Sequence, residues 1–229
     1  MYDNRFIATV NLRADGSSKL GMNNKWGFFP SASAAWVLNE EAFLKDVDWL
    51  SQLKLRAGYG LTGNQDAIEA YNSLALMSPN GVTSVNGNST ATYGFTRNSN
   101  PDLRWEVKKT FDVGVDAGIL DGRFTLTADW YTSKTTDLLY KYAVPVPPFV
   151  YPELLANLGE ITNSGVELAV SGGIVKTKDF DFNMGVNFSY QKNKLNSLSG
   201  SYMGQELQAK QYMDLSSMSG AGFVGNNRV

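Results

Sequence analysis

The feature that most constrains the fold is an alternation of apolar and polar residues with a period of two. One run has its apolar positions at Phe111, Val113, Val115, Ala117 and Ile119. A second run has them at Phe124, Leu126, Ala128 and Trp130. Successive side chains of a β-strand point to opposite faces, so each run predicts a strand with one apolar face. The Asp121-Gly122 pair between the runs favours a two-residue type I′ turn, and the sequence therefore predicts a tight hairpin here.

The same alternation recurs along the chain and predicts about seven strands. Their expected ranges are 5–13, 26–38, 51–61, 106–120, 123–140, 164–175 and 180–193. A tilted strand needs about 9–11 residues to cross a bilayer, whereas strands of soluble proteins are typically about 5–6 residues long. Most of the expected strands reach the membrane-spanning length. Strand length therefore favours an all-β fold made of an antiparallel transmembrane β-barrel segment.

The connections between the strands differ in length in a way that is typical of such barrels. They cover residues 14–25, 39–50, 62–105, 121–122, 141–163 and 176–179. Outer-membrane barrels have long external loops at one end and short periplasmic turns at the other. Connection 39–50 is long for a turn, and we expect one helical turn at residues 41–47. Loop 62–105 is rich in Asn, Ser, Gly and Thr and is expected to be irregular, and loop 141–163 is rich in proline and aromatic residues.

Composition removes most catalytic and nucleic-acid functions. The chain has no cysteine and no histidine, which excludes thiolate chemistry, the Ser-His-Asp triad and most zinc sites. Its formal charge is −2 with no block of like charge, so nucleic-acid binding has no electrostatic support. The acidic residues Glu40, Glu41, Asp46 and Asp48 occupy a polar connection and are interpreted as solvated charge. We therefore expect neither an enzyme nor a cofactor site.

A glycine motif and the hydropathy of the chain exclude two further classes of protein, a dinucleotide-binding fold and a helical membrane protein. Residues 58–63 match G-x-G-x-x-G after a strand, but the acidic residue expected about 20 positions later in a dinucleotide fold is missing. No run of about 18 apolar residues exists, so a helical membrane protein is excluded. Alternating strands of a barrel average out to a mild value such as the mean hydropathy of −0.24. The N-terminus lacks the features of a secretory signal, so we expect a cytoplasmic chain or one whose front is missing.

Three groups of residues are candidates for function. Residues on the polar strand faces are predicted to line a lumen: Asp112, Asp116, Arg123, Asp129, Glu167 and Asp181. Aromatic residues in the outer loops either contact a ligand or partner or pack the loops themselves: Tyr93, Phe95, Tyr142, Phe149 and Tyr151. Aromatic residues near strand ends either form interfacial girdles or reflect strand propensity alone: Trp26, Phe28, Trp36, Tyr59, Trp105, Trp130, Tyr131, Tyr140 and Tyr190.

Seven short motifs in series resemble the SusC/RagA family of TonB-linked outer-membrane transporters. In chain order they are NLRADGSS from residue 11, FPSASAAW from 29, EAF from 41, LKLRAGYGLTGN from 53, NPDLRWE from 100, TDLLY from 136 and NLGEITNSGVEL from 157. Each motif is short, but their order and spacing match, and the resemblance covers residues 5–195. The tail is less distinctive, although residues 222–229 look like the approach to a strand.

The resemblance implies a location in the cell outer membrane and import of large nutrients, either glycans or peptides. It implies a barrel of about 22 strands that holds a plug, a SusD-like surface lipoprotein as partner, and energy supplied by TonB. The family's N-terminal signal, TonB box and plug have no counterpart in residues 1–229, so we expect this chain to be part of the barrel domain alone. A contact with TonB would then run through the missing N-terminal parts.

A soluble β-sandwich that binds carbohydrate is the alternative to a transporter. Alternation alone does not separate the two, because both have strands with one apolar face. A sandwich hides that face between its sheets, whereas a barrel turns it outward to lipid. The position of the apolar face therefore decides between the two functions.

Overall fold

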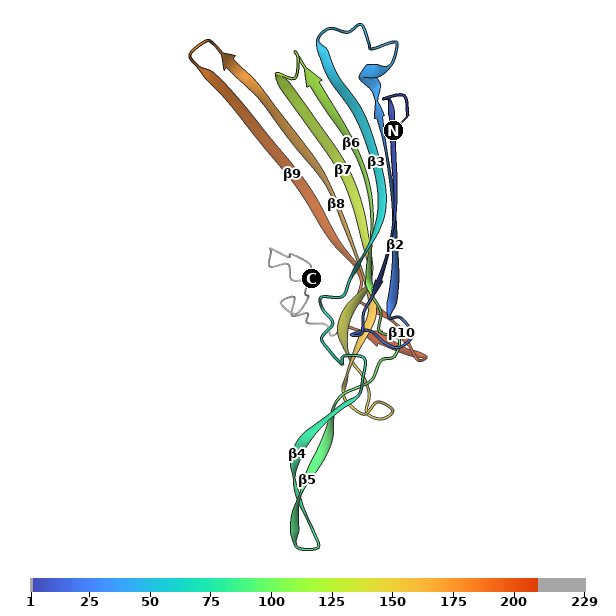
Figure 1. Cartoon of the computed structure of the whole chain (residues 1–229). Helices are drawn as coiled ribbons and strands as arrows, with labels where there is room; N and C mark the ends of the chain where they lie inside the picture. The colour runs from blue at the N-terminus through green and yellow to red at the C-terminus, as the bar shows by residue number, and fades with distance from the viewer. Residues whose placement is uncertain (1, 210–229) are drawn as a thin grey trace.

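The computed structural model describes residues 2–209, and one antiparallel sheet of seven strands dominates it (Figure 1). The strand order is β1-β2-β3-β6-β7-β8-β9. From β1 to β9, strands that follow one another in the chain are therefore paired, except that the two strands between β3 and β6 form a separate sheet and β3 pairs with β6. The strands are β1 (Phe6–Gly16), β2 (Trp26–Val37), β3 (Leu50–Asn64), β6 (Glu106–Ile119), β7 (Phe124–Ala143), β8 (Glu153–Lys176) and β9 (Asp181–Ser197). The predicted all-β meander of about seven strands is confirmed.

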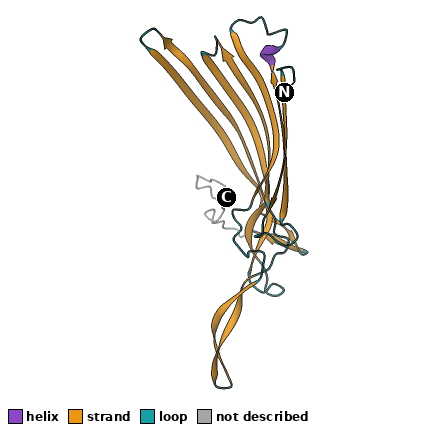
Figure 2. Ribbon diagram, viewed as in Figure 1, coloured by secondary structure: helices purple, strands orange, loops and turns teal. Residues whose placement is uncertain are grey.

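The two ends of the sheet carry different connections (Figure 2). Residues 120–123 and 177–180 form tight turns at one end, which we call the short-turn end. Asp121 and Gly122 have φ of +56° and +77°, as the two central residues of the predicted type I′ turn require, and Leu120 before them also has a positive φ. The opposite end, which we call the long-loop end, carries the connections that follow β1, β3 and β7.

The long-loop end holds more regular structure than the sequence predicts. Loop 62–105 contains a second hairpin, β4 (Leu76–Val85) with β5 (Asn88–Arg97), which projects away from the main sheet (Figure 1). The prediction of an irregular loop is therefore wrong for this part. Its turn is Asn86-Gly87, with φ of +53° and +81°, a two-residue type I′ geometry.

Other boundaries also differ from the expectation. The predicted loop 141–163 shrinks to residues 144–152, because β7 and β8 both extend past the expected strand ends. In the connection 39–50, where one helical turn was expected at 41–47, the helical segment is a 3-10 helix just before it, η1 (Leu38–Glu40). Residues 41–47 form turns. Two short strands near the end, β10 (Ser199–Tyr202) and β11 (Gln205–Gln208), were not predicted. The predicted strand approach at 222–229 lies outside the described residues.

The buried core lies at the long-loop end of the sheet and not at its middle. One cluster consists of Leu20, Phe29, Ile68, Leu103 and Trp105. A second consists of Tyr142, Val144, Leu154, Ala156 and Leu207. These clusters hold the extended ends of β7 and β8 against the segments around them. Among residues 2–209 no helix has the length and apolar character needed to cross a membrane.

Candidate functional site

The main sheet has two faces of opposite character, and the apolar one is the more exposed. A single row of paired residues crosses all seven strands on the apolar face: Phe6, Trp36, Leu55, Val115, Ala128, Leu168 and Phe188. Leu55 is 40% exposed and Phe188 is 59% exposed. On the polar face, by contrast, the Asp116 side chain is only 19% exposed. This distribution is inverted relative to a soluble protein, which buries its apolar side chains.

The apolar residues form a band that crosses the sheet obliquely. On β1 the band covers Phe6 to Ala14, which is the row of Phe6 and the positions beyond it toward the long-loop end. On β9 the band covers Phe182 to Tyr190. Phe188 is the residue of β9 on the row of Phe6, so most of the band on β9 lies on the short-turn side of that row. The position of the band therefore shifts by roughly one residue per strand toward the short-turn end. One residue spans about 3.3 Å and strands lie about 4.8 Å apart, so the band crosses the strands as if they were tilted by about 35°. Strands of outer-membrane barrels are tilted by about 35–45° from the membrane normal.

Four charged side chains form a network in the middle of the polar face. Arg56 on β3 lies between two carboxylates, with Nε 2.8 Å from Asp116 Oδ2 and Nη2 2.9 Å from Asp129 Oδ1. Lys54 Nζ lies 2.9 Å from the same Asp116 oxygen. The network therefore links β3, β6 and β7 across the face. Each carboxylate has a cationic partner, which offsets part of the cost of withdrawing its charge from bulk water.

Glycine at position 114 makes room for this network. Gly114 lies between Arg56 and Asp129 in the register of the sheet. A Cβ at this position would lie 2.0 Å from Asp129 Oδ1 and 2.8 Å from Arg56 Nη2. The missing side chain thus lets the Arg56 guanidinium reach across β6 to β7.

The six predicted lumen residues fall into two groups on the polar side. Asp112, Asp116, Asp129 and Glu167 lie together on the central rows, and an open depression there is lined by Asp129 and Glu167 among others. Arg123 lies at the short-turn end and donates to the carbonyl oxygens of Gly173 and Ile174. Asp181, also at that end, accepts from the side chain of Asn183. The structure therefore brings four of the six together.

Sequence reasoning missed the two cations of the network. Lys54 and Arg56 occupy polar positions of a predicted strand, but the connection 62–105 separates them from Asp116 and Asp129. Only the pairing of β3 with β6 brings them together. The opposite charges of the two strands are the one signal in the sequence for this pairing, since β3 carries Lys54 and Arg56 and β6 carries Asp116.

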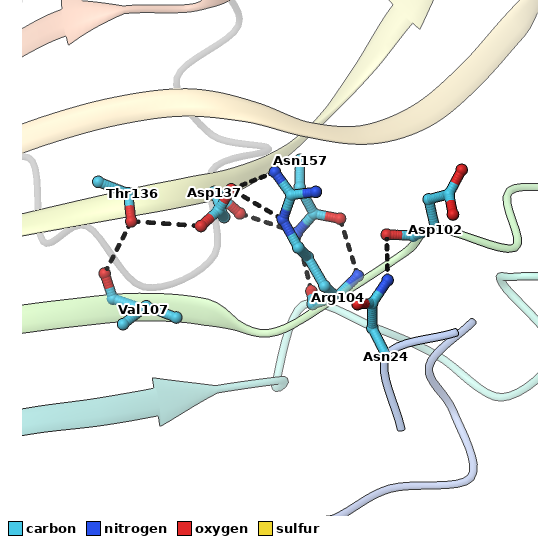
Figure 3. A network of polar contacts seen from close by, with 7 residues as sticks. All are labelled: Asn24, Asp102, Arg104, Val107, Thr136, Asp137 and Asn157. Carbon is cyan, nitrogen blue, oxygen red and sulfur yellow. Dashed lines mark hydrogen bonds and ion pairs between the residues drawn. The ribbon is translucent and has the colours of Figure 1, made fainter. Parts of the chain in front are cut away.

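Polar contacts at the long-loop end fix the segment before β6 to β7 and β8 (Figure 3). Arg104 donates from Nε and Nη2 to Asp137 Oδ1 at 2.9 and 2.6 Å. The Asn157 side chain donates to the carbonyl oxygens of Arg104 and Asp137, both at 2.8 Å, and accepts from the Arg104 backbone N–H. Asp137 has a φ of +61° at a register shift of β7. Arg104 and Asn157 thus clamp the irregular part of β7.

Two further asparagines continue this attachment along β8. Asn98 donates to the carbonyl oxygens of Tyr151 and Glu153 and accepts from the backbone N–H of Val150 and Tyr151. Asn100 donates to the Leu155 carbonyl oxygen at 2.8 Å. Side-chain amides here take the role of strand-to-strand backbone bonds. The base of the β4–β5 hairpin is therefore firmly tied to the end of the sheet.

Glu106 is a nearly buried carboxylate at the same end. It is 5% exposed and accepts hydrogen bonds from Asn64 Nδ2 and the Leu139 backbone N–H, both at 3.0 Å. It lies outside the apolar band, which begins at Phe111 on β6. Burial raises the pKa of Glu106 above its ordinary value, with the two hydrogen bonds opposing that shift.

The predicted aromatic contacts differ in their exposure. Tyr93 and Phe95 on the projecting hairpin are 60% and 43% exposed and are free to meet a ligand or partner. Phe149 and Tyr151 are half-buried, and Phe149 packs against the second core cluster. Tyr142 is completely buried in that cluster, so the prediction that it contacts a ligand is wrong. Its position on a strand that extends beyond the expected end explains the error.

The list of expected girdle residues also needs correction. Of the expected residues, Tyr59, Trp130 and Tyr190 lie on the apolar face near the long-loop end of the band. Trp105 is instead buried in the first core cluster, Tyr140 packs against the second, and the ring of Tyr131 lies on the polar face with Asp112 as its paired residue. Within residues 2–209 no group of three acidic, cysteine or histidine side chains is placed to hold a metal ion.

Sequence comparisons show that the chain is similar to TonB-dependent receptors. The profile of the family described as TonB dependent receptor-like, beta-barrel matches residues 2–223. The chain is 36% identical over 199 residues to the TonB-dependent receptor SusC of Bacteroides thetaiotaomicron, covering 86% of this chain and 20% of that protein. It is 38% identical over 198 residues to the TonB-dependent receptor P3 of Formosa agariphila, covering 85% and 19%. The chain thus spans about a fifth of the length of these relatives.

Solved structures of a peptide importer have the same fold. The RagAB peptide importer in its open-open state superposes with a TM-score of 0.79 at 30% identity, covering 86% of this chain and 21% of that chain. Its closed-closed state gives a TM-score of 0.75 at 27% identity, covering 90% and 23%.

Proposed function

The chain belongs to the TonB-dependent receptor-like β-barrel family, and on that premise we propose that it forms part of the wall of a plugged outer-membrane barrel that imports glycans or peptides. The family is one of outer-membrane receptors and transporters and not of enzymes. The observation that carries the proposal is the inverted sheet, with an exposed apolar band on one face and an ion-pair network on the other. A soluble β-sandwich is disfavoured because it would cover the apolar band with a second sheet.

In this proposal the polar face lines the lumen and the apolar band faces lipid. An outward apolar band and a polar interior are typical of outer-membrane barrels. The lumenal surface then includes Asp112, Asp116, Asp129 and Glu167, with Arg123 and Asp181 at its short-turn end. Lys54 and Arg56 leave this surface with a mixed charge, which suits a passage for large polar solutes more than a site for one small ion.

The long-loop end is assigned to the cell exterior. Long external loops and short periplasmic turns are the rule for outer-membrane barrels, and turns 120–123 and 177–180 are the short ones here. Cysteines introduced as Asn86→Cys and Val146→Cys in the full-length protein should react with a membrane-impermeant maleimide on intact cells. Gly122→Cys and Lys178→Cys should react only after the outer membrane is breached, and the opposite pattern would reverse the topology.

We also propose that the β4–β5 hairpin contacts a SusD-like surface lipoprotein or the substrate that it delivers. Residues 70–96 contain no charged side chain, and the hairpin exposes Met77, Val82, Tyr93 and Phe95. An isolated two-stranded hairpin is marginally stable in water, so a partner that covers its apolar side chains would stabilise it. Any contact with TonB would run through parts of the protein outside this chain.

Pull-down of the lipoprotein by the full-length protein tests the hairpin contact. The Tyr93→Ala/Phe95→Ala variant should retain much less lipoprotein, because exposed aromatic side chains contribute most to interfaces. Thr90→Ala/Thr92→Ala is the matched control, since both residues lie on the other face of β5. Equal loss in both variants would indicate a folding defect of the hairpin, and no loss in either would remove the hairpin from the interface.

A further inference from the structure

Four lysines interrupt the apolar face of the sheet at its long-loop end. Alternation places them on the same face as the apolar band, at Lys109 on β6, Lys134 on β7, and Lys192 and Lys194 on β9. All four are exposed. We call this group the outer lysine patch.

The pairing of the strands brings these lysines onto neighbouring rows. Lys109 is paired directly with Lys134 across β6 and β7. Lys134 is paired with Thr162 on β8, which is paired in turn with Lys194 on β9. Lys192 lies one row nearer to the band. The patch therefore extends across four adjacent strands.

The patch begins where the apolar band ends. Phe111 and Tyr190 are the last band residues on β6 and β9, and Lys109 and Lys192 are the next outward positions on those strands. On β7 the band ends at Trp130, and Lys134 follows after one intervening outward residue, Thr132. Successive residues on the same face of a strand are about 6.6 Å apart. The ammonium groups therefore lie at the depth of lipid headgroups if the band spans the hydrocarbon layer.

The charge of the patch is poorly compensated within the sheet. Lys134 Nζ lies 2.9 Å from Glu160 Oε2, which lowers the pKa of Glu160. Among residues 2–209, Lys109, Lys192 and Lys194 take part in no ion pair. Like charges placed directly opposite each other on paired strands are destabilising. Glu160 compensates only Lys134, so Lys109 faces a like charge without an acidic partner of its own.

We propose that the outer lysine patch binds the phosphate of an anionic lipid headgroup in the leaflet at the long-loop end. A phosphate accepts hydrogen bonds from several ammonium groups at once, and lysine is a common phosphate ligand. The adjoining apolar band supplies a surface for acyl chains, which a free anion would not use. Basic clusters next to a membrane-spanning surface are typical of headgroup sites. The choice of leaflet rests on the topology proposed above, which the cysteine labelling reports separately from lipid binding.

Native mass spectrometry of the full-length protein in neutral detergent tests this site, with bisphosphorylated lipid A and its dephosphorylated form as probes. Wild-type protein should retain the bisphosphorylated lipid and not the dephosphorylated one. Each lysine near an anionic surface contributes roughly fivefold to binding, so Lys109→Gln/Lys134→Gln/Lys194→Gln should bind roughly 100-fold more weakly. Lys108→Gln/Lys176→Gln/Lys178→Gln removes the same charge away from the patch and should bind like wild type.

A second measurement covers the case in which the triple variant fails to fold. In lipid-free detergent, Lys109→Gln should unfold at a higher temperature than wild type, because it removes the repulsion with Lys134. Added bisphosphorylated lipid A should raise the unfolding temperature of wild type more than that of the variant. Equal lipid shifts in both proteins, equal retention of the dephosphorylated lipid, or displacement of the lipid by millimolar inorganic phosphate would each overturn the proposal.

Discussion

Arg56 on β3 and Asp129 on β7 form an ion pair across the intervening strand, with Nη2 2.9 Å from Oδ1. The contact passes over Gly114, whose missing side chain leaves the space that the two groups fill. It ties three strands together on the polar face, where side chains are less exposed than on the apolar face.

Removing the guanidinium should destabilise the barrel. Arg56→Met leaves Asp129 without its ion-pair partner and should lower the free energy of unfolding by about 1–3 kcal/mol. Arg56→Lys keeps the charge but not the forked geometry, so its free energy of unfolding should lie between those of wild type and Arg56→Met. Urea unfolding of the full-length protein in lipid, followed by heat-modifiable gel migration, measures the difference. Wild-type stability of Arg56→Met would show that the pair is merely a surface contact.

Gly114→Ala should produce a similar defect without changing any charge. The added Cβ would lie 2.0 Å from Asp129 Oδ1 and would force the carboxylate away from Arg56. Gly185→Ala is the control, because the nearest atom to a Cβ there is 3.7 Å away. The same unfolding measurement should show a loss for Gly114→Ala only. A loss of equal size in both variants would trace the effect to strand glycines in general.

Lysine substitutions should separate the two faces of β7. Leu126→Lys places a charge in the apolar band and should lower stability by about 2–4 kcal/mol if it lies near the bilayer midplane. Thr127→Lys faces the other way, next to Asp116, and should cost much less. Unfolding of both variants in lipid vesicles gives the comparison. Similar costs at the two positions would contradict the assignment of faces.

Glu106 should make stability depend on pH. Its pKa is raised in the folded state, so its contribution is fully present below about pH 4.5, the ordinary value, and is lost as the pH rises through the folded pKa. The difference in stability between wild type and Glu106→Gln should therefore change with pH in favour of the variant as the pH rises. A pH-independent difference for Glu106→Gln would mean that burial does not shift this group.

Much of the sheet could be predicted from the sequence because one physical pattern specifies it. Alternation identified the seven main strands, and Asp121-Gly122 identified the turn between β6 and β7. The β4–β5 hairpin carries the same kind of signal at Asn86-Gly87, but its flanks are rich in Ser, Thr and Gly and alternate only weakly. The hairpin was therefore missed for lack of contrast between apolar and polar positions.

The remainder depended on contacts between distant parts of the chain. β7 and β8 extend past their expected ends because Tyr142, Leu154 and Ala156 pack into one cluster. The Lys54 and Arg56 partners could not be assigned without the β3–β6 register. Asn98, Asn100 and Asn157 resemble ordinary loop residues in sequence, and only the structure reveals that they bond the backbone of distant segments.

The central claim is that the apolar face of this sheet meets lipid and the polar face meets the lumen. Spin labels placed singly at residues 124–130 of the full-length protein in lipid vesicles test it through their collision rates with oxygen and with a water-soluble nickel complex. We predict high oxygen accessibility at positions 124, 126, 128 and 130 and low values at 125, 127 and 129, because oxygen concentrates in the bilayer. The opposite phase, or no alternation along β7, would contradict the account.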